Sequence, residues 1–188
     1  MKKIIVIEGM DRCGKSSLAN KLVTDYAVQN YSIIHSGKPP KNLSKSELRM
    51  WSFFYNKQLI EKSEQLLEFL DLVILDRSYL GEYVYGSLYR GHDYFNEDIS
   101  SIEQFIQNPK SWSIMTFVDS PDNLIQRDDG KSLSVDVDKL RREFGLFKWV
   151  TQTSKIQNKQ FIDWSNPKYE YSDECLSEII QRARGDAQ

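Results

Sequence analysis

The chain has 188 residues, a length that suits one domain with a full hydrophobic core. Hydrophobic residues make up 40% and charged residues 28%, which is typical of globular proteins in water. The formal net charge of −2 excludes a broad cationic surface, so neither a nucleic acid nor a membrane is expected as a partner.

Two cysteines, Cys13 and Cys175, are too few for a disulfide framework and favour a reducing, cytoplasmic setting. The apolar run near the start is too short for a signal peptide or a membrane-spanning helix. No repeat, low-complexity tract or linker divides the sequence, so we expect residues 1–188 to form a single domain.

Residues 9–16 match the phosphate-binding pattern G-x-x-x-x-G-K-[ST] between an apolar run that predicts a strand, residues 3–7, and a helical pattern from residue 17. Gly9 and Gly14 let the backbone turn tightly near an anion. We expect Lys15 to contact the β- and γ-phosphates of ATP and Ser16 to hold Mg²⁺. The predicted ATP-binding residues are Gly9, Met10, Asp11, Arg12, Cys13, Gly14, Lys15, Ser16, Ser17 and, from a later segment, Arg127.

A second strand is predicted at residues 31–35, and Pro39-Pro40 ends it. Lys38 lies in the loop that follows. Loops at the carboxyl ends of parallel strands line the ligand crevice, so Lys38 is either a phosphate contact or a solvated lysine.

A long helix is predicted over residues 44–70, where Ser44 and Glu47 form a capping box. Its apolar stripe, which predicts the face toward the core, consists of Leu48, Trp51, Tyr55 and Leu59. Another face of this helix carries three residues at a spacing of four, namely Arg49, Phe53 and Lys57. Such a basic–aromatic–basic stripe suits a flat, phosphorylated substrate, although an exposed helix face with one phenylalanine is the alternative.

A third buried strand is predicted at residues 72–75, and Asp76 and Arg77 follow it directly. An aspartate at this place is typical of a carboxylate that orients Mg²⁺, and an arginine offers a planar fork for phosphate. The alternative is a helix cap followed by a surface arginine. In the helix predicted over residues 79–90, Glu82 and Tyr85 are candidates for base or sugar contacts, with packing as the alternative.

These motifs carry a resemblance. Residues 7–16 resemble the opening of thymidylate kinases, whose loop reads E-G-x-D-x-x-G-K-[ST], and Asp76-Arg77-Ser78 resembles their D-R-[YHS] motif. The stretch Tyr-Gly-x-x-x-Arg-Gly at residues 85–91 is similar to small deoxynucleoside monophosphate kinases of bacteriophages. Two features depart from the thymidylate kinase pattern: the R-E-P-G-G loop is absent, and Gly81, Glu82 and Gly86 replace the residues that usually face the base.

The resemblance implies roles for single residues. Asp11 would contact the deoxyribose 3′-hydroxyl, Arg12 would stabilise the transferred phosphoryl group, and Phe53 would stack on the base. The implied catalytic residues are Arg12, Lys15, Asp76 and Arg77, and the implied Mg²⁺ ligands are Ser16 and Asp76. The predicted acceptor-binding residues are Asp11, Lys38, Phe53, Lys57, Arg77, Glu82 and Tyr85.

The second half completes an α/β pattern, with strands predicted at residues 112–119 and 160–164 and helices at residues 99–107, 136–153 and 173–184. Residues of about 120–135 lie where such kinases carry a mobile lid. We expect a P-loop NTPase fold with a five-stranded parallel sheet and helices on both faces. The strand order 2-3-1-4-5 comes from the resemblance.

The predicted reaction transfers the γ-phosphoryl group of ATP, with Mg²⁺, to a deoxynucleoside 5′-monophosphate, namely dTMP or a related pyrimidine nucleotide. A deoxynucleoside kinase is a competing candidate. Such an enzyme needs a carboxylate base near the 5′-hydroxyl, and Glu8 lies too close to the sheet to be a good candidate for that base. A small-metabolite or polynucleotide kinase is another candidate, and so is a non-catalytic ATP-binding protein. The resemblance implies that the protein forms a homodimer. If a phage encodes the chain, we expect the protein in the cytoplasm of the host cell.

Overall fold

The computed structural model describes residues 2–24, 29–91, 96–128, 130, 133–169 and 172–184. Five parallel strands form one sheet, in the order β2-β3-β1-β4-β5. Their bounds are β1 Lys3–Gly9, β2 Tyr31–His35, β3 Leu72–Asp76, β4 Trp112–Val118 and β5 Asn158–Asp163. The predicted α/β class and strand order are therefore confirmed.

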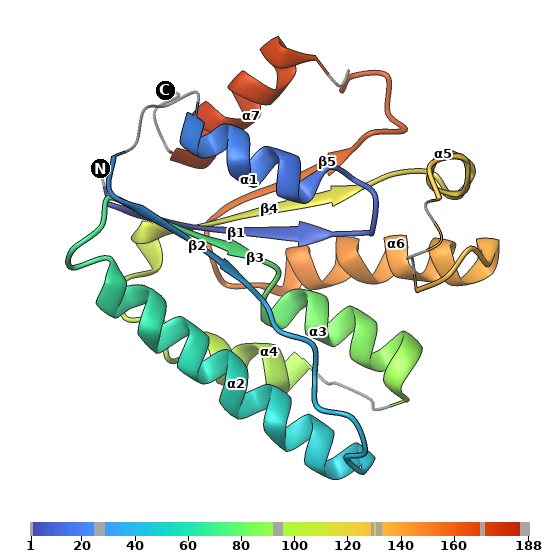
Figure 1. Cartoon of the computed structure of the whole chain (residues 1–188), viewed down its shortest axis with the longest axis horizontal. Coiled ribbons are helices and arrows are strands. Elements are labelled where there is room, and N and C mark those ends of the chain that lie inside the picture. The colour runs from blue at the N-terminus through green and yellow to red at the C-terminus, as the bar shows by residue number, and fades with distance from the viewer. Residues whose placement is uncertain are drawn as a thin grey trace.

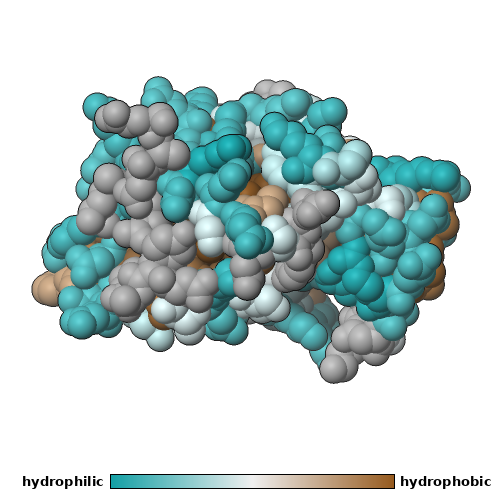
Figure 2. Space-filling model, turned by 90° about the horizontal axis from the view of Figure 1, so that it is seen from above, coloured by the Kyte–Doolittle hydropathy of each residue, from teal (hydrophilic) through white to brown (hydrophobic). Residues whose placement is uncertain are grey.

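Helices cover both faces of the sheet, as predicted (Figure 1). On one face lie α1, Lys15–Thr24, and α7, Asp173–Arg184. On the other face lie α2, Lys45–Leu66, α3, Tyr79–Tyr85, α4, Asn96–Glu103, and α6, Val137–Thr153. The short helix α5, Pro121–Gln126, follows β4 at the carboxyl end of the sheet. Seen from the side of α1 and α7, most of the coloured surface is hydrophilic, with some apolar patches (Figure 2). The buried apolar side chains of these two helices belong to the core.

The three central strands are buried on both sides, which explains their continuous apolar sequences. Ile4, Ile74 and Ile114 show no exposed surface, and Phe147 of α6 packs against this core from one side. The pairing places Ile7 of β1 beside Asp76 of β3 and Gly9 beside Phe117 of β4. The register therefore brings the ends of three strands to one edge of the sheet.

Several element bounds differ from the predictions for local reasons. The helix predicted over residues 79–90 consists of α3 and a π-helical turn, Gly86–Arg90, which ends where Gly91 adopts a φ of 66°. The capping box of Ser44 and Glu47 is present at the start of α2, as predicted, but α2 ends at Leu66 rather than near residue 70. The helix predicted over residues 99–107 lies earlier in the chain, as α4.

Candidate active site

The phosphate-binding loop connects β1 to α1 and is held against the end of β4. The amide of Met10 donates a hydrogen bond of 3.0 Å to the carbonyl oxygen of Phe117. A Cβ atom at Gly9 would lie 1.9 Å from that oxygen, and Gly9 has a φ of 129°. Glycine is required here because no other residue fits this close backbone approach. Arg12 and Gly14 also have positive φ values, of 67° and 75°, which turn the loop around the start of α1.

Lys15 is buried beneath this loop, and its ammonium group donates a hydrogen bond to the carbonyl oxygen of Met10. Burial lowers its pKa, and the nearby Arg77 lowers it further. An anionic phosphate would restore the stability of the charged form. Burial raises the pKa of Cys13 to about 12, so this thiol stays protonated and unreactive inside the loop.

Ser16, at the start of α1, meets Asp76, at the end of β3. The hydroxyl of Ser16 donates a hydrogen bond of 3.1 Å to Oδ2 of Asp76, and Nδ1 of His35 lies 2.8 Å from the same oxygen. A hydroxyl and a carboxylate are hard oxygen ligands that fit Mg²⁺ carried by a nucleotide. Sequence reasoning missed His35; its position at the carboxyl end of a strand was the available signal.

Across the described ranges, no three His, Cys, Asp or Glu side chains gather as a metal site. Ser16 and Asp76 would therefore share an ion with phosphate oxygens, as Mg²⁺ often does, rather than enclose it.

Arg77 points at the phosphate-binding loop from β3. Its backbone has a φ of 71°, and its amide donates a hydrogen bond of 2.9 Å to the carbonyl oxygen of Ile7. Its guanidinium forms an ion pair with Asp11 and lies 5.0 Å from the ring centre of Tyr85. The structure thus brings together Asp11, Arg77 and Tyr85, which the sequence predicted from separate motifs.

These residues line a cleft of about 660 Å³, which we call the acceptor cleft. Its described lining contains the cations Arg12, Lys38, Lys41, Arg77 and Arg90 and the anions Asp11 and Glu82. Arg90 and Glu82 form an ion pair, as do Arg77 and Asp11. The excess of positive charge favours a phosphorylated ligand.

An aromatic pair from α2 forms one wall of the acceptor cleft. The rings of Trp51 and Tyr55 are stacked, with centres 4.9 Å apart and planes at 15°. The hydroxyl of Tyr55 accepts a hydrogen bond of 2.9 Å from the amide of Gly37, in the loop after β2. The predicted core stripe is therefore correct for Leu48 and Leu59, which are buried. Tyr55 packs against the core and also lines the cleft, whereas Trp51 lines the cleft.

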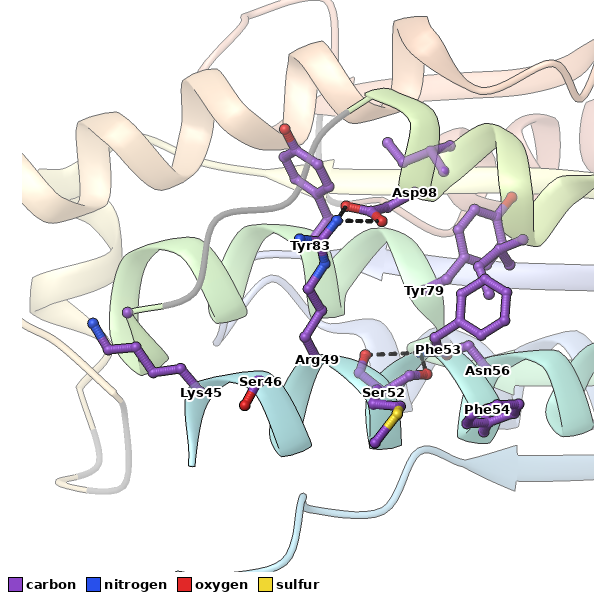
Figure 3. A pocket seen from close by; sticks show the side chains of 14 residues that line it. Lys45, Ser46, Arg49, Ser52, Phe53, Phe54, Asn56, Tyr79, Tyr83 and Asp98 are labelled. Atoms are coloured by element: carbon purple, nitrogen blue, oxygen red, sulfur yellow. Dashed lines mark hydrogen bonds and ion pairs between the residues drawn. The ribbon is translucent and has the colours of Figure 1, made fainter. Parts of the chain in front are cut away.

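Phe53 and Lys57 do not join Arg77. Phe53 lines a second cavity of about 750 Å³ between α2, α3 and α4. Figure 3 shows Arg49 reaching across this cavity to Asp98, with which it forms two contacts of 2.8 Å. The ammonium group of Lys57 lies 4.7 Å from the ring centre of Phe105. Phe53 and Lys57, which the sequence predicted to bind the acceptor, are not among the described residues that line the acceptor cleft, because they lie on the side of α2 opposite to Trp51 and Tyr55.

The segment after α5 lies against the phosphate-binding loop. The guanidinium of Arg12 is 3.2 Å from Oδ1 of Asp128 and donates a hydrogen bond of 3.3 Å to the carbonyl oxygen of Ser134. Arg127 forms an ion pair with Asp119 and donates a hydrogen bond of 3.2 Å to the carbonyl oxygen of Arg12. Arg127 therefore lies beside the loop, while residues 129, 131 and 132 of the predicted lid lie outside the described residues.

Comparisons with known proteins identify structural relatives but no sequence relatives. No family model and no curated protein matches the sequence. The thymidylate kinase of Candida albicans matches with a TM-score of 0.71 and 16% identity, over 98% of this chain and 92% of that chain. The thymidylate kinase of Ehrlichia chaffeensis matches with a TM-score of 0.65 and 15% identity, over 96% and 97% of the two chains.

A third match is the YorR protein of Bacillus subtilis, whose structure was solved in complex with phosphorylated GDP. Its TM-score is 0.66 and its identity 20%, over 95% of this chain and 94% of that chain. Over almost its whole length, this chain has the P-loop fold of thymidylate kinases.

Within the described ranges, no helix is both long and apolar enough to cross a bilayer.

Proposed function

We propose that the protein is a nucleoside monophosphate kinase that transfers the γ-phosphoryl group of ATP to a deoxynucleoside 5′-monophosphate, namely dTMP or a related pyrimidine nucleotide. The observation that carries the proposal is the ion pair between Arg77 and Asp11. This contact joins the arginine at the end of β3 to the phosphate-binding loop, and both residues line a cleft that also contains Arg12.

Positioning and charge neutralisation account for most of the catalysis in such a transfer. Lys15 and the loop amides would hold the donor phosphates, and Arg77 would hold the acceptor phosphate by a bidentate contact. Arg12, which comes from the loop itself, would neutralise the charge that develops between the two ligands. Ser16 and Asp76 would hold Mg²⁺, which neutralises phosphate charge when it is bound.

The stacked rings of Trp51 and Tyr55 support binding of a base, because aromatic faces stack on nucleobases. Glu82 and Arg90 offer a hydrogen-bond acceptor and donor in the same cleft. In this proposal, Trp51 and Tyr55 replace Phe53 as the base platform. A homodimer in the cytoplasm also belongs to the proposal, and size-exclusion chromatography tests the assembly.

A deoxynucleoside kinase is disfavoured by the position of Glu8. Such an enzyme needs a carboxylate near the 5′-hydroxyl, whereas Glu8 is fully buried and accepts a hydrogen bond from the amide of Ser78. Glu8 is not among the described residues that line the acceptor cleft. Because Glu8 is buried away from this cleft, it is a poor candidate for the general base of a nucleoside kinase.

One coupled assay tests the proposal. ATP and Mg²⁺ are offered with a panel of ribo- and deoxynucleoside monophosphates, and each matching nucleoside is assayed beside its monophosphate. We expect ADP formation with pyrimidine deoxynucleotides and none with nucleosides. ADP formation with nucleosides alone would point to a nucleoside kinase, and ATP binding without turnover of any acceptor would point to a non-catalytic protein.

A further inference from the structure

Glu8 is a buried acid that none of the roles described above uses. It precedes Gly9 at the end of β1, and it has no exposed surface. Its Oε1 accepts a hydrogen bond of 2.8 Å from the amide of Ser78, whereas its Oε2 is buried and has no hydrogen-bond partner among the described residues. A buried acidic side chain is costly unless its surroundings compensate, so this placement requires an explanation.

The first explanation concerns the start of α3. Helices usually begin with a side chain that accepts hydrogen bonds from the first free amides. Ser78 is the residue before α3, but its side chain caps no amide within the described part of the chain. From the neighbouring strand, Glu8 accepts the amide of Ser78 itself at this helix start. The start of α3 is therefore attached directly to the strand that carries the phosphate-binding loop.

The second explanation concerns Arg77, which lies between β3 and Ser78. Its φ of 71° is uncommon for a residue with a side chain and persists only where the surroundings hold it. Two consecutive residues of β1 provide that support. The carbonyl oxygen of Ile7 accepts the amide of Arg77, and the carboxyl group of Glu8 accepts the next amide. The backbone of Arg77 is thus fixed at both of its peptide bonds.

We propose that Glu8 is a positioning residue that keeps Arg77 in its left-handed conformation and so aims its guanidinium at Asp11 and at the acceptor phosphate. The effect on substrate rests on the proposed function, whereas the effect on the conformation of Arg77 does not. Glu8 touches no reacting group; it acts through the backbone of Arg77 and Ser78.

Gly81 supports this role because its missing side chain makes room for Glu8. A Cβ atom at Gly81 would lie 2.6 Å from Oε2 of Glu8, closer than real Cβ contacts. Burial also raises the pKa of Glu8 to about 8, so the carboxyl group is largely protonated at pH 7 and glutamine is a close mimic.

The test compares Glu8→Ala with Glu8→Gln in steady-state kinetics. Glutamine keeps an oxygen that can accept the amide of Ser78, whereas alanine removes it. We expect Glu8→Ala to raise the KM for the acceptor about tenfold or more while the KM for ATP changes less than about twofold. We expect Glu8→Gln to stay within about threefold of the unaltered protein in both constants. Equal losses for both substrates, or an unchanged acceptor KM, would overturn the proposal.

Glu64→Ala is the matched control for general destabilisation. Glu64 is a part-buried acid of α2 that accepts hydrogen bonds from the amides of Gln107 and Asn108 and from the indole N–H of Trp112. Trp112 starts β4, so this site lies at the other end of the sheet from Arg77. We expect this variant to lower thermal stability without changing the ratio of the two KM values. If this variant changed the ratio of the two KM values as much as Glu8→Ala does, the effect of Glu8→Ala would be explained by general destabilisation.

A crystal structure of each Glu8 variant separates this inference from the proposed kinase activity. We expect the φ of Arg77 to stay positive in Glu8→Gln and to become negative in Glu8→Ala, with loss of the contact to Asp11. If Glu8→Ala does not fold, Gly81→Ala pushes on Oε2 and should produce the same displacement. An unchanged Arg77 in every variant that folds would overturn the inference, whether or not any acceptor is phosphorylated.

Discussion

The hydroxyl of Ser16 donates a hydrogen bond to Asp76 over 3.1 Å, although the two residues are 60 positions apart in the chain. The contact exists because β1 and β3 are neighbours in the sheet, with Ile7 paired to Asp76. The start of α1 and the end of β3 therefore meet at one edge. This edge is where a phosphate-bound cation would be held.

Lys15→Met and Arg77→Ala are expected to affect different substrates. Lys15→Met removes the buried ammonium that would contact the donor phosphates, and we expect kcat to fall by about 10³-fold or more. Arg77→Ala removes the acceptor contact, and we expect kcat/KM for the acceptor to fall by about 10²-fold or more with little change in ATP affinity. Coupled-assay kinetics and ATP titration by calorimetry measure these changes. The exposed Arg141→Ala is the control, and full activity of both altered proteins would contradict the mechanism.

Arg12→Ala is expected to separate turnover from binding. In the structure, Asp128 and the carbonyl oxygen of Ser134 hold the guanidinium of Arg12. A single arginine that neutralises the transition state contributes about 10³–10⁵ in rate in related transfers, so we expect a loss of that order in kcat. The dissociation constant for ATP should change less than about threefold. Asp128→Asn keeps the arginine and should retain most of the turnover, whereas equal losses in kcat and ATP affinity for Arg12→Ala would argue against this role.

Trp51→Ala and Phe53→Ala test which face of α2 meets the base. Trp51 is stacked on Tyr55 in the wall of the acceptor cleft, whereas Phe53 lies edge-on to Phe105, with ring centres 6.3 Å apart. Loss of one stacked ring costs about 1–3 kcal/mol, so we expect Trp51→Ala to raise the KM for the acceptor by about tenfold or more. Phe53→Ala should lower thermal stability and leave that KM nearly unchanged. The reverse pattern in steady-state kinetics would restore Phe53 as the base platform.

The stability of the protein is expected to fall as the pH rises from about 5 to 8. Burial raises the pKa of Glu8 from 4.5 to about 8, so in this range the folded chain binds a proton that the unfolded chain has lost. The free energy of unfolding then decreases with pH, by up to about 1.4 kcal/mol per pH unit for one such group. Burial raises the pKa of Glu143 as well, which acts in the same direction.

Urea unfolding of the unaltered protein and of Glu8→Gln at several pH values measures this effect. The glutamine variant lacks the titrating group and should show a shallower decrease. Burial lowers the pKa of Lys15, which stabilises the fold as the pH rises and so opposes the trend in the alkaline range. Parallel curves for the two proteins would show that Glu8 ionises normally in the folded chain.

The sequence by itself determined the elements whose signals are local. The strand, loop and helix around Gly9, Lys15 and Ser16 were predictable because a backbone that wraps an anion needs glycine and a cation at fixed spacing. The buried strands were predictable from their apolar, β-branched runs, and the capping box at Ser44 from its two residues. The strand order was predictable only through the resemblance, because the residue pattern of one strand does not show which strands lie beside it in the sheet.

Only the tertiary structure decided which face of α2 meets the acceptor cleft and what Glu8 does. Trp51 and Phe53 are two positions apart and point to opposite sides of α2, so the way α2 packs on the sheet decides which of them meets the acceptor cleft and which meets the second cavity. Glu8 is 70 residues from Ser78, and Gly81 leaves the space that its carboxyl group fills. Such contacts depend on how strands and helices pack at one edge of the sheet, and no local pattern of residues encodes that packing.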